Sequence, residues 1–281
     1  MDRFTAMRAF VRIVERRSFT RASEDLGLPR ATVTDAIKAL EQRLGVRLLH
    51  RTTRLVVPTL EGEAFYGRCL RLIADMDDAE ALAAELNAAG AQAIALQADV
   101  SDPQAVRQLF DAIEARFGGI DVVVNSAGVL QLAPLADTDD ALFERVIGIN
   151  LRGAFNVLRE SARRVRDGGR LITLSTSVVG IRLENYSVYA ASKAAVETMG
   201  AILSKELRGR NITVNAVAPG PTATDLFLDG KSPELIERLA KMNPLERLGM
   251  PEDIAGAVGF LAGADGGWIN GQVLRANGGM V

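Results

Sequence analysis

The sequence predicts an α/β protein in two parts: a helical N-terminal head with a β-hairpin, and a larger body built on a doubly wound parallel sheet. Three observations predict this fold class. Apolar residues recur at helical spacing in the head, β-rich runs alternate with helices after Gly90, and the net charge changes sign along the chain. The 281 residues are 48% hydrophobic, which suffices for one large domain or two smaller ones.

The charge of the chain divides at Pro58. Residues 1–58 contain 12 Lys and Arg against 6 Asp and Glu, a net charge of +6, whereas residues 59–281 contain 21 against 29, a net charge of -8. Eleven of the twelve basic residues in the head are Arg, whose guanidinium group can bind phosphate or guanine in a bidentate manner. The head therefore suits a polyanion, although a solvated basic face explains the charge equally well.

Composition excludes several classes of protein and site. The chain has one cysteine, Cys69, and one histidine, His50, which excludes a disulfide framework and any Cys-rich metal site, so we expect no metal. Five arginines among the first seventeen residues rule out a secretory segment. No run approaches the roughly 18 to 20 apolar residues of a membrane helix. We therefore expect a cytoplasmic protein that does not bind membranes.

The head contains three predicted helices and a hairpin. Apolar spacing predicts a helix over residues 2–16, and a second from about 20 to 26 ends at Gly27. After a tight turn a third helix begins at Pro29, and two helices joined in this way make a helix-turn-helix. Beyond Gly45, apolar runs over 46–49 and 55–57 flank a basic tip, which predicts a hairpin or wing.

The segment SFTRASEDLGLPRATVTDAIKALEQRLGVRLLHRTTRLVVPTLEGEAF resembles the winged helix-turn-helix of LysR-type transcriptional regulators. The resemblance extends to about residue 75, and it is specific because the helix pattern, LEQRLGVRLLHR and PTLEGE occur together in order. It implies that double-stranded DNA is a partner. The residues it implies in the major groove are Arg30, Thr32, Thr34 and Lys38, and those it implies on the flanking backbone or minor groove are Arg51 and Arg54.

A long helix is predicted to connect the head to the body. Thr59 can cap it, acidic residues favour its first turn, and it runs to Asn87 with Gly90 as its stop. The regulators that the head resembles dimerise through the corresponding helix. The predicted domains are thus a winged helix-turn-helix over 1–58, a connecting helix over 59–90, and the body over 91–281.

The body alternates between strands and helices. The strand candidates are 93–100, 121–125, 170–175, 212–217 and 272–276, and a helix over 103–117 lies between the first two. Such alternation predicts a parallel sheet, in which ligands bind beyond the carboxyl ends of the strands. Ser177 follows one of these predicted strand ends.

Tyr189 and Lys193 point to proton-transfer chemistry. Their spacing of four places both on one face of a helix. A phenol, with an ordinary pKa near ~10, becomes a useful acid or base at neutral pH when a nearby cation favours its phenolate, and Lys193 can supply that charge. The Ser177 hydroxyl can orient a substrate carbonyl. Alone, the Tyr–Lys pair is a weak signal, since such pairs usually lie on exposed helix faces.

Residues 91–281 resemble the short-chain dehydrogenase/reductase family through the ordered motifs ADVSDP, NSAG, SVVG, YAASK, NAVAPGPTATD and GQVLRANGG. The resemblance implies a Rossmann-like domain that transfers hydride between NAD or NADP and a small carbonyl or alcohol, in a homodimer or homotetramer. The catalytic residues it implies are Asn150, Ser177, Tyr189 and Lys193. The cofactor-binding residues it implies are Asp99 and Val100 at the adenine end, Asn125, Ala127 and Gly128 along the cofactor, Tyr189 and Lys193, and Pro219, Gly220, Thr222 and Thr224 near the nicotinamide. Tyr186 is interpreted as pocket wall or core.

The chain departs from this family before Asp99. Members begin with a strand, a Gly-rich TGxxxGxG turn, a helix and a second strand, and no glycines here cluster after a strand before Asp99. The Rossmann-like sheet is therefore truncated and lacks the turn that holds the diphosphate. In the family's strand order, 3-2-1-4-5-6-7, the missing strands lie between 93–100 and 121–125. We predict that these two runs pair directly; otherwise the first is displaced and an apolar edge is exposed.

Three functions are compatible with these motifs. The first joins a DNA-binding head to a dehydrogenase in which Tyr189 acts as acid or base. The second is a LysR-like regulator whose dehydrogenase-like part serves as a non-catalytic body for dimerisation or ligand sensing. The third is an inactive fusion product. The motifs favour the first, and the missing diphosphate turn opposes it.

Overall fold

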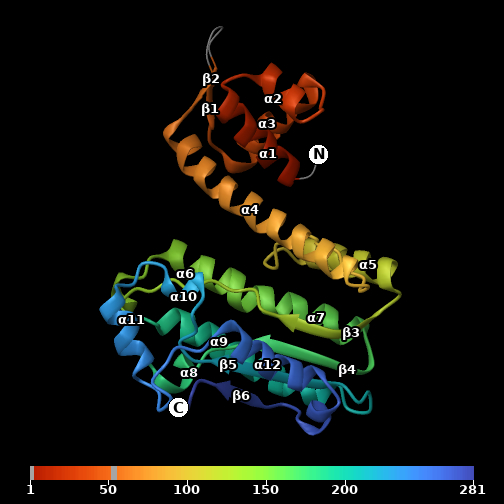
Figure 1. Ribbon diagram of the computed structural model, residues 1–281, viewed down its shortest axis with the longest axis vertical. Coiled ribbons are helices and arrows are strands. Elements are labelled where there is room, and N and C mark those ends of the chain that lie inside the picture. Colours follow the sequence, from red (N-terminus) through yellow and green to blue (C-terminus); the bar gives the residue numbers. More distant parts are fainter. Residues whose placement is uncertain (1–2, 52–55) are drawn as a thin grey trace. The chain divides into compact units, whose positions relative to one another are not determined.

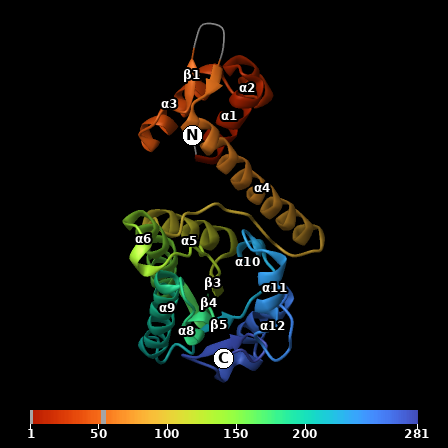
Figure 2. The same cartoon turned by 90° about the vertical axis from the view of Figure 1, so that its left-hand side faces the viewer.

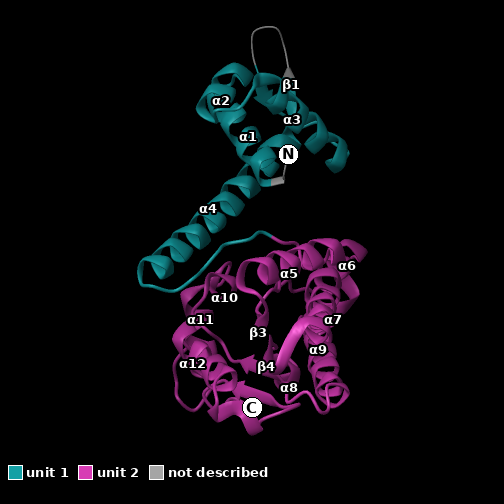
Figure 3. Cartoon of the chain, turned by 90° about the vertical axis from the view of Figure 1, so that its right-hand side faces the viewer, with its two compact units in different colours: residues 1–97 teal, residues 98–281 magenta. Residues whose placement is uncertain are grey.

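The computed structural model describes residues 3–51 and 56–281, which separate into two units, residues 1–97 and 98–281 (Figure 3). In the first unit the predicted helices and hairpin are confirmed, and β1 and β2 pair in antiparallel fashion. Its elements are α1 (Arg3–Arg16), α2 (Phe19–Asp25), α3 (Arg30–Leu44), β1 (Leu49–Arg51), β2 (Val56–Pro58) and α4 (Leu60–Ala88).

The core of the head is a closed apolar cluster. Phe10 and Ile13 of α1 and Ile37 of α3 are fully buried in it, and the ring of Phe10 lies 5.4 Å from that of Phe65 on α4. Cys69 of α4 is buried in the same cluster, and burial raises the pKa of its thiol to about 12. The thiol is therefore an inert packing group rather than a nucleophile.

The hairpin is attached to α3 and α4 by backbone contacts. The Glu41 carboxylate accepts hydrogen bonds from the backbone N–H groups of Leu48 (2.9 Å) and Leu49 (3.2 Å). The Thr59 hydroxyl caps α4 at the Gly62 N–H (2.9 Å). A Cβ on Gly62 would lie 2.1 Å from the Leu48 carbonyl oxygen, so glycine is required there. These contacts fix the base of the wing against the helix-turn-helix.

Helix α4 is the longest element of the chain, with 29 residues. It ends before Gly90, whose φ of +91° suits glycine, as predicted. Several of its leucines are exposed, including Leu82 and Leu86 at 56% and 43%. Within residues 3–51 and 56–281, no helix combines the length and apolarity that a membrane crossing requires.

The second unit is built on one parallel sheet in the order β3-β4-β5-β6, which confirms the predicted parallel α/β architecture. The strands are β3 (Ile120–Asn125), β4 (Val165–Leu174), β5 (Thr213–Pro219) and β6 (Val273–Ala276). The helices are α5 (Pro103–Phe117), α6 (Asp140–Val146), α7 (Ala154–Arg164), α8 (Val178–Ile181), α9 (Ser187–Glu206), α10 (Asp225–Leu228), α11 (Pro233–Ala240) and α12 (Pro251–Ala262), with a π-helical segment at Ile147–Gly153 and short 3₁₀ turns at Leu135–Asp137 and Asp265–Trp268.

Helices cover the two faces of this sheet unequally (Figures 1 and 2). On one face α5, α7 and α9 pack around Val106, Phe110 and Leu171 in the larger apolar cluster. On the other face α12 packs over β4, β5 and β6, with Leu261 against Ile172. Strand β3 therefore has one covered face and one open face.

The predicted strand over residues 93–100 is wrong, and so is its direct pairing with β3. Residues 91–99 form no strand, and β3 has only β4 as a neighbour among the described residues. The reason lies at Val100: its carbonyl accepts a hydrogen bond from Asn156 (2.9 Å), and a Cβ on Gly153 would come within 2.6 Å of its side chain. Those contacts hold Val100 against the end of the π-helical segment and the start of α7, and an unpaired strand is not stable.

The alternative that the sequence left open, an exposed apolar edge, is the one observed. Val122 and Val124 of β3 are 44% and 43% exposed, whereas Val123 between them packs into the larger cluster. An edge strand with exposed valines and an unpaired backbone is prone to pair with other chains.

We expect Val124→Lys to reduce self-association without loss of stability, because the side chain faces solvent and a charge on an edge strand opposes edge-to-edge pairing. The matched change Val123→Lys should lower the free energy of unfolding by about 2 to 4 kcal/mol, because it places an unpaired charge in the core. Light scattering and thermal melts of the two variants test this. Equal destabilisation by both would show that the open face of β3 is packed.

Candidate active site and DNA-binding face

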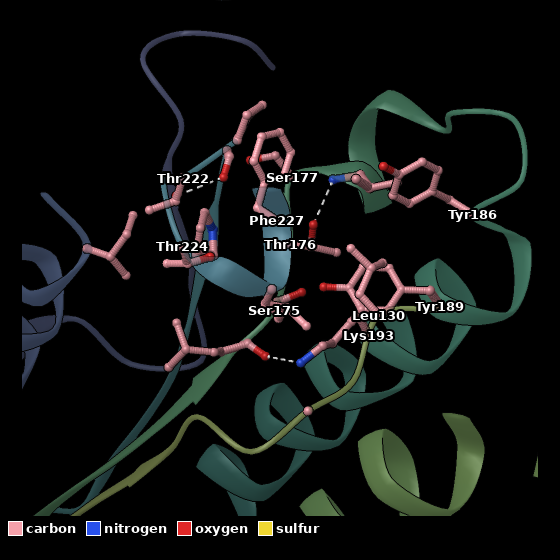
Figure 4. A pocket seen from close by; sticks show the side chains of 18 of the residues that line it. Leu130, Ser175, Thr176, Ser177, Tyr186, Tyr189, Lys193, Thr222, Thr224 and Phe227 are labelled. Atoms are coloured by element: carbon pink, nitrogen blue, oxygen red, sulfur yellow. Dashed lines mark hydrogen bonds between the residues drawn. The ribbon is translucent and has the colours of Figure 1, made fainter. Parts of the chain in front are cut away.

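A cavity of about 360 Å³ lies at the carboxyl ends of β4 and β5, beside the first turns of α9. It holds Tyr189 and Lys193 of α9 together with Thr176 and Ser177, which follow β4 (Figure 4). Apolar side chains form most of the remaining wall: Val129, Leu130, Leu174, Val178, Ile181, Leu183, Leu226, Phe227, Leu239, Ile254 and Met280. The cavity lies where ligands bind in parallel sheets.

Two hydrogen bonds tie α9 to the end of β4. The Lys193 ammonium donates to the Leu174 carbonyl oxygen (2.8 Å), and one helical turn later the Glu197 carboxylate accepts from the Ser175 hydroxyl (2.5 Å). Both α9 residues lie on the face that carries Tyr189, at a spacing of four. Burial lowers the pKa of Lys193 to about 8, because desolvation disfavours its charged form.

Tyr189 is a half-buried phenol with a raised pKa. Desolvation is the largest cause of the raised pKa, the Thr176 side chain opposes it, and the neighbouring Tyr186 adds to it. The expected lowering of this pKa by Lys193 is therefore not found, since the pKa shifts upward and desolvation dominates. Tyr186 lines the cavity as predicted, with its ring 6.3 Å from that of Tyr189.

The side chains of both Ser177 and Thr176 line the cavity. The Ser177 hydroxyl is almost fully buried; it donates to the Ala218 carbonyl oxygen (3.0 Å) and accepts from the Asn277 amide (2.9 Å). The Thr176 hydroxyl accepts a hydrogen bond from the Val178 N–H (3.3 Å), and its side chain lowers the pKa of Tyr189. Thr176 is a further polar lining residue that the sequence analysis did not single out.

Asn150 lies in the π-helical segment at Ile147–Gly153 and is buried. Its amide makes a two-way bond with the backbone of Val129, accepting at 2.8 Å and donating at 3.0 Å. A Cβ on Gly128 would lie 3.3 Å from the Lys193 ammonium and 3.4 Å from the Asn150 side-chain oxygen. Asn150 thus fixes the loop after β3 beside Lys193 without bonding to Lys193 itself.

The predicted cofactor residues divide into two groups. Those that line the cavity are Gly128, Tyr189, Lys193, Pro219, Gly220, Thr222 and Thr224. Those that lie outside its lining are Asp99, Val100, Asn125 and Ala127. Asp99 accepts hydrogen bonds from the backbone and hydroxyl of Ser101 (3.0 and 2.6 Å), which keeps it in a local turn. The residues expected near the nicotinamide therefore lie together in one cavity, whereas those expected at the adenine end lie outside its lining.

The described residues contain no group of three or more His, Cys, Asp or Glu side chains arranged to hold a metal ion. The cavity lining contains neither histidine nor carboxylate. Its ionisable groups are the phenols Tyr186 and Tyr189 and the ammonium of Lys193. The arrangement suits proton transfer and carbonyl polarisation by organic groups.

In the head, α3 presents the predicted DNA-facing residues from one element. Arg30 and Lys38 are exposed and Thr32 and Thr34 are half-buried, while Val33 and Ile37 face the core. Lys38 has a loose ion pair with Asp35 (3.8 Å), and both side chains are largely exposed. Arg54 lies outside the described residues, and of Arg51 only the backbone in β1 is described.

Comparison with known proteins agrees with both parts of the chain. Residues 70–281 match the family model described as Enoyl-(Acyl carrier protein) reductase, and residues 4–63 match that described as bacterial regulatory helix-turn-helix protein, lysR family. A short-chain type dehydrogenase/reductase of Picea abies is 50% identical over 196 residues, which are 68% of this chain and 72% of that protein. An Arabidopsis thaliana chloroplastic NADPH-dependent aldehyde reductase-like protein is 41% identical over 256 residues, 89% of this chain and 93% of that protein.

The chain belongs to the short-chain dehydrogenase/reductase family. A Burkholderia cenocepacia short-chain dehydrogenase solved in complex with NADP matches with a TM-score of 0.68 and 34% identity, over 73% of this chain and 83% of that one. A blue fluorescent protein from a metagenomic library, solved with NADPH, matches with a TM-score of 0.69 and 36% identity, over 72% and 82%. The two resemblances identified in the sequence are thus confirmed: a LysR-type helix-turn-helix segment precedes a short-chain dehydrogenase/reductase domain.

We expect Lys193→Met to raise the free energy of unfolding at pH 7. The lowered pKa means that the folded state binds this proton less tightly than the unfolded state, so wild-type stability should rise between pH 8 and about 10.5. Removing the buried charge should stabilise the fold by a net amount of about 1 to 2 kcal/mol, which includes the cost of losing the hydrogen bond to Leu174. Denaturant unfolding at pH 7 and pH 10 measures this, and the gain should vanish at pH 10. A destabilised variant at pH 7 would contradict it.

Proposed function

We propose that the dehydrogenase domain reduces a small, mainly apolar carbonyl compound, with Tyr189 as the proton donor. The observation that carries this proposal is the cavity at the carboxyl ends of β4 and β5, which the phenol of Tyr189 and the ammonium of Lys193 both line. Its walls are mainly apolar and its lining contains no carboxylate, which favours a neutral substrate.

The protonation of Tyr189 is compatible with reduction. A phenol is protonated at neutral pH, and desolvation shifts the pKa of Tyr189 further upward, so Tyr189 holds a proton that it can donate to a carbonyl oxygen. Lys193, with a pKa of about 8, is mostly charged at pH 7 and stabilises the negative charge that develops on that oxygen. The hydrogen bond from Lys193 to Leu174 holds the ammonium in the cavity wall.

We propose Thr176 as the hydroxyl that orients the substrate carbonyl. Thr176 lines the cavity together with Tyr189 and lowers the pKa of that phenol, which supports this role, whereas the two bonds of Ser177 to Ala218 and Asn277 suit a support for the loops behind the cavity. Asn150 positions the loop after β3 through Val129.

A nicotinamide cofactor fits one end of this site. NADP or NADPH is bound in two similar structures, which supports NADP or NAD as the cofactor of this chain. When bound, it supplies or accepts the hydride. Gly128, whose Cβ would crowd Lys193, leaves space beside the ammonium, and the hydroxyls of Thr222 and Thr224 line the same cavity. Asp99, Val100, Asn125 and Ala127 stay candidates for contacts with the rest of the cofactor.

Paired substitutions distinguish the two hydroxyls. Tyr189→Phe should lower kcat for reduction of an aromatic aldehyde with NADPH by about 10²- to 10⁴-fold, because it removes the general acid. Thr176→Val should also lower kcat with little change in KM, whereas the control Ser177→Ala should lower the melting temperature more than kcat. Steady-state kinetics and thermal melts measure both. If Ser177→Ala abolishes turnover in a folded protein and Thr176→Val does not, Ser177 is the orienting hydroxyl.

As a second function we propose that the head binds double-stranded DNA and regulates transcription, with residues 1–58 as the DNA-binding domain, 59–90 as the connector and 91–281 as the enzyme or sensor body. The exposed basic face of α3 in a segment of charge +6 supports this. The exposed leucines of α4 support dimerisation through that helix. If the dehydrogenase domain is inactive, DNA binding is the function that remains for the chain.

We expect affinity for a mixed-sequence duplex to fall linearly with log salt concentration, since Lys and Arg displace counterions from phosphates. Lys38→Ala should weaken binding and reduce the slope by about 1 if Lys38 meets a phosphate. Arg107→Ala, an exposed change on α5 in the other unit, is the matched control and should leave the slope unchanged. Mobility shifts across a salt series test this, and a flat salt response would contradict DNA binding.

A further inference from the structure

The charge of the active-site cavity limits what it can bind. Among the 25 residues that line it, Lys193 is the single cation, and its ammonium already donates to the Leu174 carbonyl oxygen. The lining contains no arginine and no second lysine. A ligand that brings two or more phosphate charges into this cavity would find one counter-charge, shared with the reacting oxygen.

The strand ends around the cavity offer no diphosphate site either. A diphosphate needs several backbone N–H groups from a Gly-rich turn and a helix N-terminus. In the described part of the sheet, the turns after β3, β4 and β5 contain at most one glycine each before the next helical segment, and α8 and α10 after β4 and β5 have four residues each. Strand β6 is followed by Gly278 and Gly279 but by no helix.

The cavity is, in contrast, suited to a neutral ring that carries one amide. Aromatic and aliphatic walls come from Tyr186, Phe227 and Ile181, and polar partners come from Thr222 and Thr224. The volume of about 360 Å³ lies at the small end of the range for ligand pockets, roughly 300 to 1,000 Å³. A few polar groups in an apolar wall are what orient a small ligand of this kind.

We infer that this site binds its hydride donor through the nicotinamide ring alone and accepts N-substituted dihydronicotinamides that carry no adenosine diphosphate. The inference rests on the proposed reductase function, and it specifies the class of donor. In the lining, the adenosine diphosphate half finds no cation besides Lys193 and no turn of N–H groups, and the Lys231 ammonium beside Phe227 already donates to the Phe227 carbonyl oxygen, so this half adds little affinity. For the same reason the 2′-phosphate that distinguishes NADPH from NADH has no partner in the cavity lining.

Ligand-observed NMR on the full chain, at about 0.15 M salt to screen the basic head, tests this with NADPH, NADH, N-benzyl-dihydronicotinamide and ADP-ribose. In saturation-transfer spectra of NADPH, the nicotinamide ring protons should receive saturation and the adenine ring protons should receive little. Titration should give dissociation constants for the three reduced nicotinamides within about fivefold of one another, and none for ADP-ribose in the same range.

Two matched phenylalanine variants locate the binding. Phe227 lines the cavity and has the Lys231 ammonium 4.6 Å from its ring centre, whereas Phe155 on α7 lies outside the lining and has the Arg159 guanidinium at 4.9 Å. Phe227→Ala should weaken the binding of N-benzyl-dihydronicotinamide by about 3- to 10-fold, because an aromatic contact is lost. Phe155→Ala should leave its dissociation constant unchanged.

The outcomes separate the two proposals. Strong saturation of the adenine protons, ADP-ribose binding, or NADPH binding more than about 30-fold tighter than N-benzyl-dihydronicotinamide, a preference of about 2 kcal/mol for the adenosine diphosphate half, would overturn the inference and leave the reductase function intact. Binding of none of the reduced nicotinamides would overturn both. Equal effects of the two phenylalanine variants would also overturn the inference, because the ligand would then lie outside this cavity.

Discussion

The hydrogen bond from the Lys193 ammonium to the Leu174 carbonyl oxygen organises the dehydrogenase domain around its site. It joins the middle of α9 to the last residue of β4, and the bond between Glu197 and Ser175 repeats the join one turn further along the helix. Because residues four apart share a helix face, these two contacts also aim Tyr189 at the strand end. The position of the phenol follows from the position of the amine.

The same contact explains why the pKa values of Lys193 and Tyr189 are shifted. Holding the amine in the wall requires its burial, and burial lowers its pKa to about 8 while raising that of Tyr189. Both shifts destabilise a charge that water would solvate, so the fold is less stable than one with apolar residues at these positions. In return, a neutral phenol and an ammonium line the same cavity. Perturbed titratable groups of this kind are typical of functional sites.

Local signals in the sequence predicted most elements, whereas features that depend on distant partners were not predictable. Helix α5 was predicted to the residue because Asp102 caps it and Gly118, with a φ of +76°, ends it. The strand over 93–100 failed because a strand exists only beside a neighbour, and its pattern of apolar residues does not reveal that Asn156 holds Val100 on α7. Three successive hydroxyl residues, Ser175, Thr176 and Ser177, follow β4 and all line the cavity, so the sequence alone does not decide which of them orients a ligand.

The site has the side chains expected for proton transfer but lacks the turn expected to bind the diphosphate of the cofactor. The groups proposed to act on the reacting atoms, Tyr189, Lys193 and Thr176, all lie within the second unit and line one cavity. Enzymes commonly use binding energy from remote parts of a ligand to position its reactive part. Under the proposed reductase function, a chain without the turn for the diphosphate lacks that source of binding energy but keeps the phenol and the ammonium. The apolar walls then orient the ring and the carbonyl, so shape complementarity rather than phosphate recognition sets specificity.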